Sequence, residues 1–226
     1  MTANPKHRKP RARASARSLA CAQTRSPVAA ARKLKPFLQG DLDGLCGIYS
    51  VVNAIRLLCP EINREQSGEL FSALIGQLRK EGRPPSEFVS DGIEATEVQR
   101  LVRTAQRFVK GEYDVRIVVK PLELNRHRRR YDEMWQALEA ATNDNAVAIL
   151  GLSGHHGHWT VVYRASDRAA HLFDSDNLKL LVRSRCSLDE RRTLHWIGPE
   201  DVVFLHRSDA LVRRAPGRQR RVVEGQ

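Results

Sequence analysis

Hydrophobic residues recur at helical spacing in the first half of the chain and gather in short, dense runs in the second half. Apolar positions three and four residues apart predict helices, which span 46–58, 65–80, 96–108 and 131–141. Short runs of aliphatic and aromatic residues predict strands, which span 113–119, 146–152, 159–163, 170–174, 178–182 and 201–206. Because most helices precede most strands, we predict an α+β fold, with N-terminal helices packed on a C-terminal antiparallel β-sheet.

Charge divides the chain into two basic ends and a nearly neutral body. Of the 226 residues, 1–35 hold ten Lys and Arg and no acid, whereas 207–226 hold six basic and two acidic residues. The net charge of +12 therefore resides in the ends, and residues 36–206 carry 22 basic and 24 acidic side chains. We predict a disordered basic segment over 1–35, one domain over 36–206 and a basic tail over 207–226.

The composition of the ends also bears on location and partners. Residues 1–35 lack the apolar core of a secretory signal peptide, and no run approaches the roughly 18 apolar residues of a membrane span. We expect a soluble protein without a membrane span, either cytoplasmic or secreted as an effector without a classical signal peptide. The basic tails favour weak contact with nucleic acid or an anionic surface, and solvated charge that aids solubility is the alternative.

Cys46 stands where a cysteine becomes reactive. It follows a turn-rich segment, 39–45, and begins the first predicted helix, which stops before Pro60. Unpaired N–H groups and the positive end of the helix dipole favour a thiolate at a helix start, and the thiolate is the nucleophilic form. Asp41 and Asp43 are expected to cap this helix or to make the turn, and a role in shaping substrate contacts is the alternative. A buried structural cysteine is the alternative interpretation of Cys46.

His158 and Asp174 provide a base and a carboxylate to orient it. His158 begins a predicted strand, and Asp174 ends the next one, so a hairpin between the two strands brings the side chains together. The chain then carries a nucleophile, a base and an orienting acid in the order Cys46, His158, Asp174. Gln39 could donate its side-chain amide to a developing oxyanion. Asp176, two residues after Asp174, is the alternative orienting group.

We predict no metal and no cofactor. No two of the four cysteines form a CxxC pair, which argues against a zinc site built on cysteine. The cysteines are Cys21, Cys46, Cys59 and Cys186. His155 and His156 lie near His158 on a glycine-rich loop, but their spacing matches no ligand motif.

These residues resemble the papain-like cysteine proteases. The run 158–161, His-Trp-Thr-Val, and the glutamine before Cys46 are most similar to the double-glycine leader peptidases that process bacteriocins and to their stand-alone relatives. The separation of 16 residues between His158 and Asp174 is similar to the papain interval. The resemblance covers about residues 36–206 and implies a papain-like fold. It also implies that Cys46 is the nucleophile, His158 the base, Asp174 the orienting group and Gln39 the oxyanion donor, although Gln39 lies seven residues before Cys46 and the papain pattern has six.

The resemblance implies a thiol-dependent hydrolase, a peptidase or isopeptidase that acts on a protein or peptide substrate through an acyl-enzyme intermediate. The same triad serves transglutaminases, deamidases and arylamine acetyltransferases, so acyl transfer and deamidation stay open. The non-enzymatic alternative is a module that binds nucleic acid or anionic surfaces through its basic tails.

Overall fold

The computed structural model describes residues 26–41, 43–124, 130–154, 157–188 and 193–208. Residues 1–25 and 209–226 lie outside the described residues, so the predictions made for them stay predictions. The last strand described runs to Ser208, where it pairs with the start of another strand.

The prediction of disorder is wrong for residues 26–35. A short helix, α1 (Pro27–Ala31), begins there, and Ala30 is buried in the hydrophobic core. Proline at the first helical position fits a helix start, and the Ser26 hydroxyl accepts a hydrogen bond from the backbone N–H of Ala29. The low apolar content of this segment hides the few small residues that pack against the rest of the chain.

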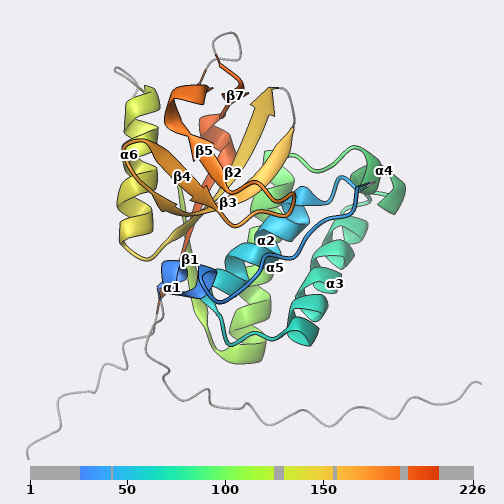
Figure 1. Cartoon of the computed structure of the whole chain (residues 1–226). Coiled ribbons are helices and arrows are strands. Elements are labelled where there is room, and N and C mark those ends of the chain that lie inside the picture. Colours follow the sequence, from blue (N-terminus) through green and yellow to red (C-terminus); the bar gives the residue numbers. More distant parts are fainter. Residues whose placement is uncertain (1–25, 42, 125–129, 155–156, 189–192, 209–226) are drawn as a thin grey trace, which may run out of the picture.

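The structure has the predicted α+β architecture, in which N-terminal helices pack against a C-terminal antiparallel β-sheet (Figure 1). The main sheet has its strands in the order β1 (Arg116–Pro121), β8 (Val202–Ser208), β2 (Val147–Gly154), β3 (His158–Ala165), β4 (Ala169–Leu172) and β5 (Leu180–Val182). Neighbouring strands in this order are all antiparallel. The last strand in sequence thus lies inside the sheet.

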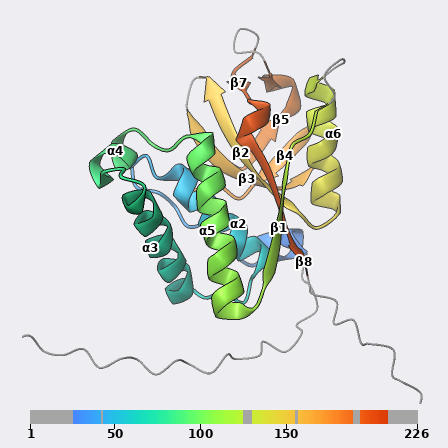
Figure 2. The ribbon, with the colours of Figure 1, turned by 180° about the vertical axis from the view of Figure 1, so that it is seen from behind.

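The central helix is α2 (Cys46–Leu58), which is buried along nearly its whole length and packs against β3. Two longer helices, α3 (Arg64–Lys80) and α5 (Ala95–Tyr113), pack against α2 and against each other. Figure 2 shows α5 from behind, beside β1 and β8. Because α5 continues to Tyr113, the strand predicted from residue 113 begins only at Arg116.

Successive residues of β2 face opposite sides of the sheet, so they belong alternately to two separate hydrophobic cores. Val147 and Ile149 pack into the core that contains α2, α3 and α5. Ala148 and Leu150 pack into a second core, which α6 (Arg130–Asn143) covers on the other face. The sheet therefore separates the N-terminal helices from α6.

Several short elements occur where the sequence pattern predicts none. They are the helix α4 (Pro85–Ser90), the strands β6 (Cys186–Ser187) and β7 (His195–Trp196), and the 3-10 turns η1 (Arg183–Arg185) and η2 (Pro199–Asp201). The pair β6–β7 is parallel and departs from the antiparallel arrangement elsewhere. None of these short elements carries a hydrophobic period or a distinct apolar run of its own, so the sequence pattern does not reveal them.

Candidate active site

The structure brings the start of α2 against the start of β3. Cys46 is the first residue of α2, and His158 is the first residue of β3. The buried Ser50 hydroxyl, one turn after Cys46, donates a hydrogen bond of 2.8 Å to the carbonyl of Trp159, the residue after His158. This contact fixes the helix start that carries the thiol next to the strand that carries the imidazole.

His158 contacts Asp174 and lies near Cys46. The Nε2 atom of His158 is 2.7 Å from the Oδ2 atom of Asp174, and the Cys46 thiol is close enough to the imidazole to help raise its pKa. Cys46 and His158 each keep 8% of their surface exposed, whereas Asp174 keeps 1%. All three residues are therefore largely buried, and the Asp174 carboxylate is shielded most completely from water.

Asp174 is held by the turn in which it lies. Its Oδ1 atom accepts hydrogen bonds from the backbone N–H groups of Asp176 at 2.7 Å and Leu178 at 3.0 Å. These bonds draw the chain away from the sheet, so β4 ends at Leu172, earlier than predicted. Asp176 is exposed and supports Asp174 through its backbone. The structure thus favours Asp174 over Asp176 as the partner of the imidazole.

The charges of His158 and Asp174 stabilise each other. Burial lowers the pKa of His158, but the hydrogen bond to Asp174 and the interaction with Cys46 outweigh burial and raise this pKa to about 10. Burial raises the pKa of Asp174, yet His158 and the bonds from its neighbours hold that pKa below its ordinary value. At neutral pH the pair therefore carries an imidazolium and a carboxylate.

Gln39 lies against the turn that carries Asp174. Its backbone N–H donates to the carbonyl of Ser175 at 3.0 Å, and its side-chain Oε1 accepts from the Ser175 hydroxyl at 3.4 Å. Among the described residues the Nε2 group of Gln39 makes no hydrogen bond, so its two hydrogens can serve a ligand. The structure brings Gln39 to the Asp174 side of the site and shows no direct contact with Cys46.

Asp43 makes the turn before Cys46, one of the two roles expected from the sequence. Its carboxylate accepts hydrogen bonds from the backbone N–H groups of Gly40 at 2.7 Å and Leu45 at 3.2 Å. Asp41 is exposed. The side chain of Asp43 thus closes the chain into a tight turn directly ahead of the nucleophile helix.

Two glycines near Cys46 allow a third segment to approach, a role that was not predicted for them. A Cβ atom on Gly44 would lie 2.9 Å from the backbone nitrogen of Gly92, and one on Gly47 would lie 2.6 Å from the Ile93 side chain. The Trp159 indole also donates a hydrogen bond of 2.9 Å to the carbonyl of Ile93. The only signal in the sequence is the pair of glycines flanking the cysteine.

The sequence also raised the questions of a metal site and a membrane span. Within the described parts of the chain, no group of three or more His, Cys, Asp or Glu side chains could hold a metal ion. His155 and His156 lie outside those residues, as do most of the basic ends. No helix in the ranges described is both long enough and apolar enough to cross a membrane.

Comparisons of the sequence with models of known protein families and with curated proteins, and of the fold with solved structures, find no match.

Proposed function

We propose that the chain is a thiol-dependent hydrolase, a papain-like peptidase or isopeptidase in which Cys46, His158 and Asp174 form a catalytic triad. The observation that carries the proposal is the imidazole of His158, whose Nε2 atom lies 2.7 Å from a buried carboxylate and which also interacts with a thiol at a helix start. Nucleophile, base and orienting group in this arrangement are the requirements of covalent acyl chemistry.

The first half of the reaction forms a thioester. The Cys46 thiolate attacks the carbonyl carbon of the scissile amide, and the carbonyl electrons move to its oxygen. Unpaired N–H groups at the start of α2 and the amide of Gln39 donate to this oxyanion. When the oxyanion collapses, the carbon–nitrogen bond breaks, and the leaving amine takes the proton from the His158 imidazolium.

The second half of the reaction releases the acyl group. Neutral His158 removes a proton from water, and the resulting hydroxide attacks the thioester carbonyl. The carbon–sulfur bond then breaks, which releases a carboxylic acid and restores the thiolate and the imidazolium. Asp174 holds the ring in one orientation throughout and stabilises its positive charge.

The test is site-specific labelling with iodoacetamide at pH 6–7, followed by mass mapping of the modified cysteine. We expect Cys46 to react in the wild type, Cys46→Ala to abolish this labelling, and His158→Ala to slow it at least about tenfold. Cys186→Ala is the control, because burial raises the pKa of Cys186 to about 12 and leaves it an inert thiol. Labelling of Cys46→Ala at the wild-type rate would mean that another cysteine is the reactive one.

The products of turnover decide which acyl acceptor the site uses. Incubation with a mixture of peptides and isopeptide-linked conjugates should produce a new carboxylate and a new amine from each cleaved bond. Release of ammonia from glutamine without chain cleavage would instead assign the triad to deamidation, and transfer to an added amine would assign it to acyl transfer.

A further inference from the structure

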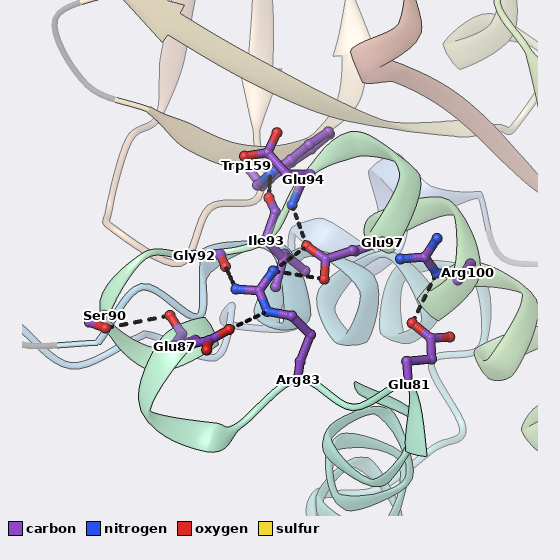
Figure 3. A network of polar contacts seen from close by, with 10 residues as sticks. All are labelled: Glu81, Arg83, Glu87, Ser90, Gly92, Ile93, Glu94, Glu97, Arg100 and Trp159. Carbon is purple, nitrogen blue, oxygen red and sulfur yellow. Dashed lines mark hydrogen bonds and ion pairs between the residues drawn. The ribbon is translucent and has the colours of Figure 1, made fainter. Parts of the chain in front are cut away.

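Arg83 joins helix α4 and the loop that follows it to helix α5. It lies just after α3, and its Nη1 atom donates to both carboxylate oxygens of Glu97, at 2.9 and 3.0 Å (Figure 3). Its Nη2 atom donates to the carbonyl of Gly92 at 3.4 Å, and its Nε atom forms an ion pair with Glu87 at 3.4 Å. One guanidinium therefore contacts α4, the loop that follows α4, and α5.

Glu97 completes this anchor. Its carboxylate is almost fully buried, so its charge requires the partners that Arg83 supplies. The same carboxylate accepts a hydrogen bond of 2.8 Å from the backbone N–H of Glu94, which caps the start of α5. Gly92 has a φ of 75°, a backbone conformation that suits glycine, and its carbonyl is thereby directed to Arg83. The loop ahead of α5 is thus fixed at both of its ends.

The anchored segment touches both halves of the candidate active site. The carbonyl of Val89 accepts a hydrogen bond from the backbone N–H of Gly44, two residues before Cys46. The carbonyl of Ile93 accepts the indole N–H of Trp159, the residue after His158 (Figure 3). The segment therefore bridges the loop that precedes the nucleophile and the strand that carries the base.

We propose that Arg83 is a positioning residue for catalysis, which sets the separation of Cys46 and His158 by anchoring residues 84–94 to α5. The proposal rests on the function proposed above. Arg83 acts through two backbone carbonyls, those of Val89 and Ile93, and it does not itself touch the reacting groups. A lysine cannot replace it fully, because one ammonium group lacks the planar fork that reaches both Glu97 and Gly92.

The test compares the rate of Cys46 alkylation by iodoacetamide at pH 6 with the rate at pH 9 in the folded full-length chain. We expect the wild type, in which the imidazole of His158 lies near the thiol, to give a higher ratio of these two rates than the variants. Arg83→Gln should lower the ratio at least tenfold, and Arg83→Lys should give an intermediate value. Asp174, which is hydrogen-bonded to His158, is unchanged in both variants, and so are Asp43 in the turn before Cys46 and Glu94 at the start of α5.

Arg100→Gln is the matched control. Arg100 also forms an ion pair from α5, with Glu81 at 2.9 Å, in the same region of the fold (Figure 3). None of the contacts of Arg100 among the described residues reaches the segment 84–94. Arg100→Gln removes one positive charge, as Arg83→Gln does. Loss of the Arg100–Glu81 pair should nevertheless leave the alkylation ratio within twofold of the wild type.

Each outcome decides the proposal. If Arg83→Gln unfolds at lower urea concentration but keeps the wild-type alkylation ratio while folded, Arg83 is only a structural anchor and the inference is wrong. If Arg83→Gln does not fold, Arg83→Lys and Glu97→Gln carry the same comparison, and an unchanged ratio in both overturns it. A wild-type protein whose Cys46 does not react at pH 6 would contradict the proposed function itself, whatever the variants do.

Discussion

At the scale of single residues, Gln39 is held by its backbone N–H and by its side-chain amide oxygen. Ser175 supplies both contacts, at 3.0 and 3.4 Å. A side-chain amide that is anchored through its oxygen keeps its N–H groups in one direction, as an oxyanion donor requires. The departure of one residue from the papain spacing therefore does not prevent Gln39 from taking this role.

Gln39→Ala should separate oxyanion stabilisation from thiol reactivity. We expect about a 100-fold loss in kcat for an activated ester substrate, since removal of one oxyanion donor typically costs that much. Alkylation of Cys46 by iodoacetamide forms no oxyanion, so its rate should stay within about twofold. Asp176→Asn, which changes an exposed carboxylate nearby, is the control and should affect neither rate. Ester turnover at the wild-type rate in Gln39→Ala would remove Gln39 from the site.

The residues of the candidate triad could be predicted because local rules place each of them. A turn-rich segment before an apolar helix locates Cys46, and a hairpin with a fixed interval pairs His158 with Asp174. Ile93 and Arg83 could not be found in this way. They reach the site through contacts with segments far away in sequence, and neither has a local pattern that marks it.

At the scale of elements, α2 can pack against the segment after α4 because Gly47 has no side chain. The Ile93 side chain occupies the place where a Cβ atom of Gly47 would lie, and the Trp159 ring is 3.2 Å from the same point. Close packing at Gly47 brings the first turn of α2, the segment after α4 and β3 together.

Gly47→Ala should therefore destabilise the fold. The added methyl would lie 2.6 Å from Ile93, and overpacking of this kind costs about 1–3 kcal/mol in the free energy of unfolding. Gly76→Ala is the control in α3, where a Cβ atom meets nothing within 4 Å and alanine should add roughly 0.5–1 kcal/mol. Urea unfolding of both variants measures the difference. Equal stability of the two variants would mean that the segment shifts freely away from α2.

The sequence predicts the elements that have a clear apolar pattern. The helices α2, α3, α5 and α6 show a helical period, the six strands of the main sheet coincide with short apolar runs, and all were predicted, with ends that differ by a few residues. The ends differ where a side chain intervenes, as Asp174 does after β4. The helices α1 and α4 have six residues or fewer, and tertiary contacts decide their conformation.

At the scale of the whole molecule, the buried ion pair of the site links stability to pH. The pKa of His158 is raised to about 10, so its contribution to stability is complete below its unfolded value of about 6.5 and is lost as the pH rises through about 10. The pKa of Asp174 is lowered, so its contribution is present above its unfolded value of about 3.9 and is lost as the pH falls below that value.

His158→Gln tests this linkage. The wild type should exceed the variant in free energy of unfolding most between about pH 4 and 6.5, and the difference should shrink as the pH rises toward about 10. Urea titrations at several pH values between 4 and 10.5 measure it. Asp176→Asn should run parallel to the wild type over this range. A difference that grows with rising pH would have the wrong sign for a protonated imidazole in the folded state.

The place of β8 within the sheet has a consequence for synthesis on the ribosome. This strand lies between β1 and β2, yet it comes after both of them in the chain. A nascent chain that has not reached residue 202 can form the hairpins β2–β3 and β3–β4, but β1 has no neighbour to join. The sheet therefore closes late in translation, and the proposed hydrolytic activity, if it needs the finished sheet, would be withheld until then.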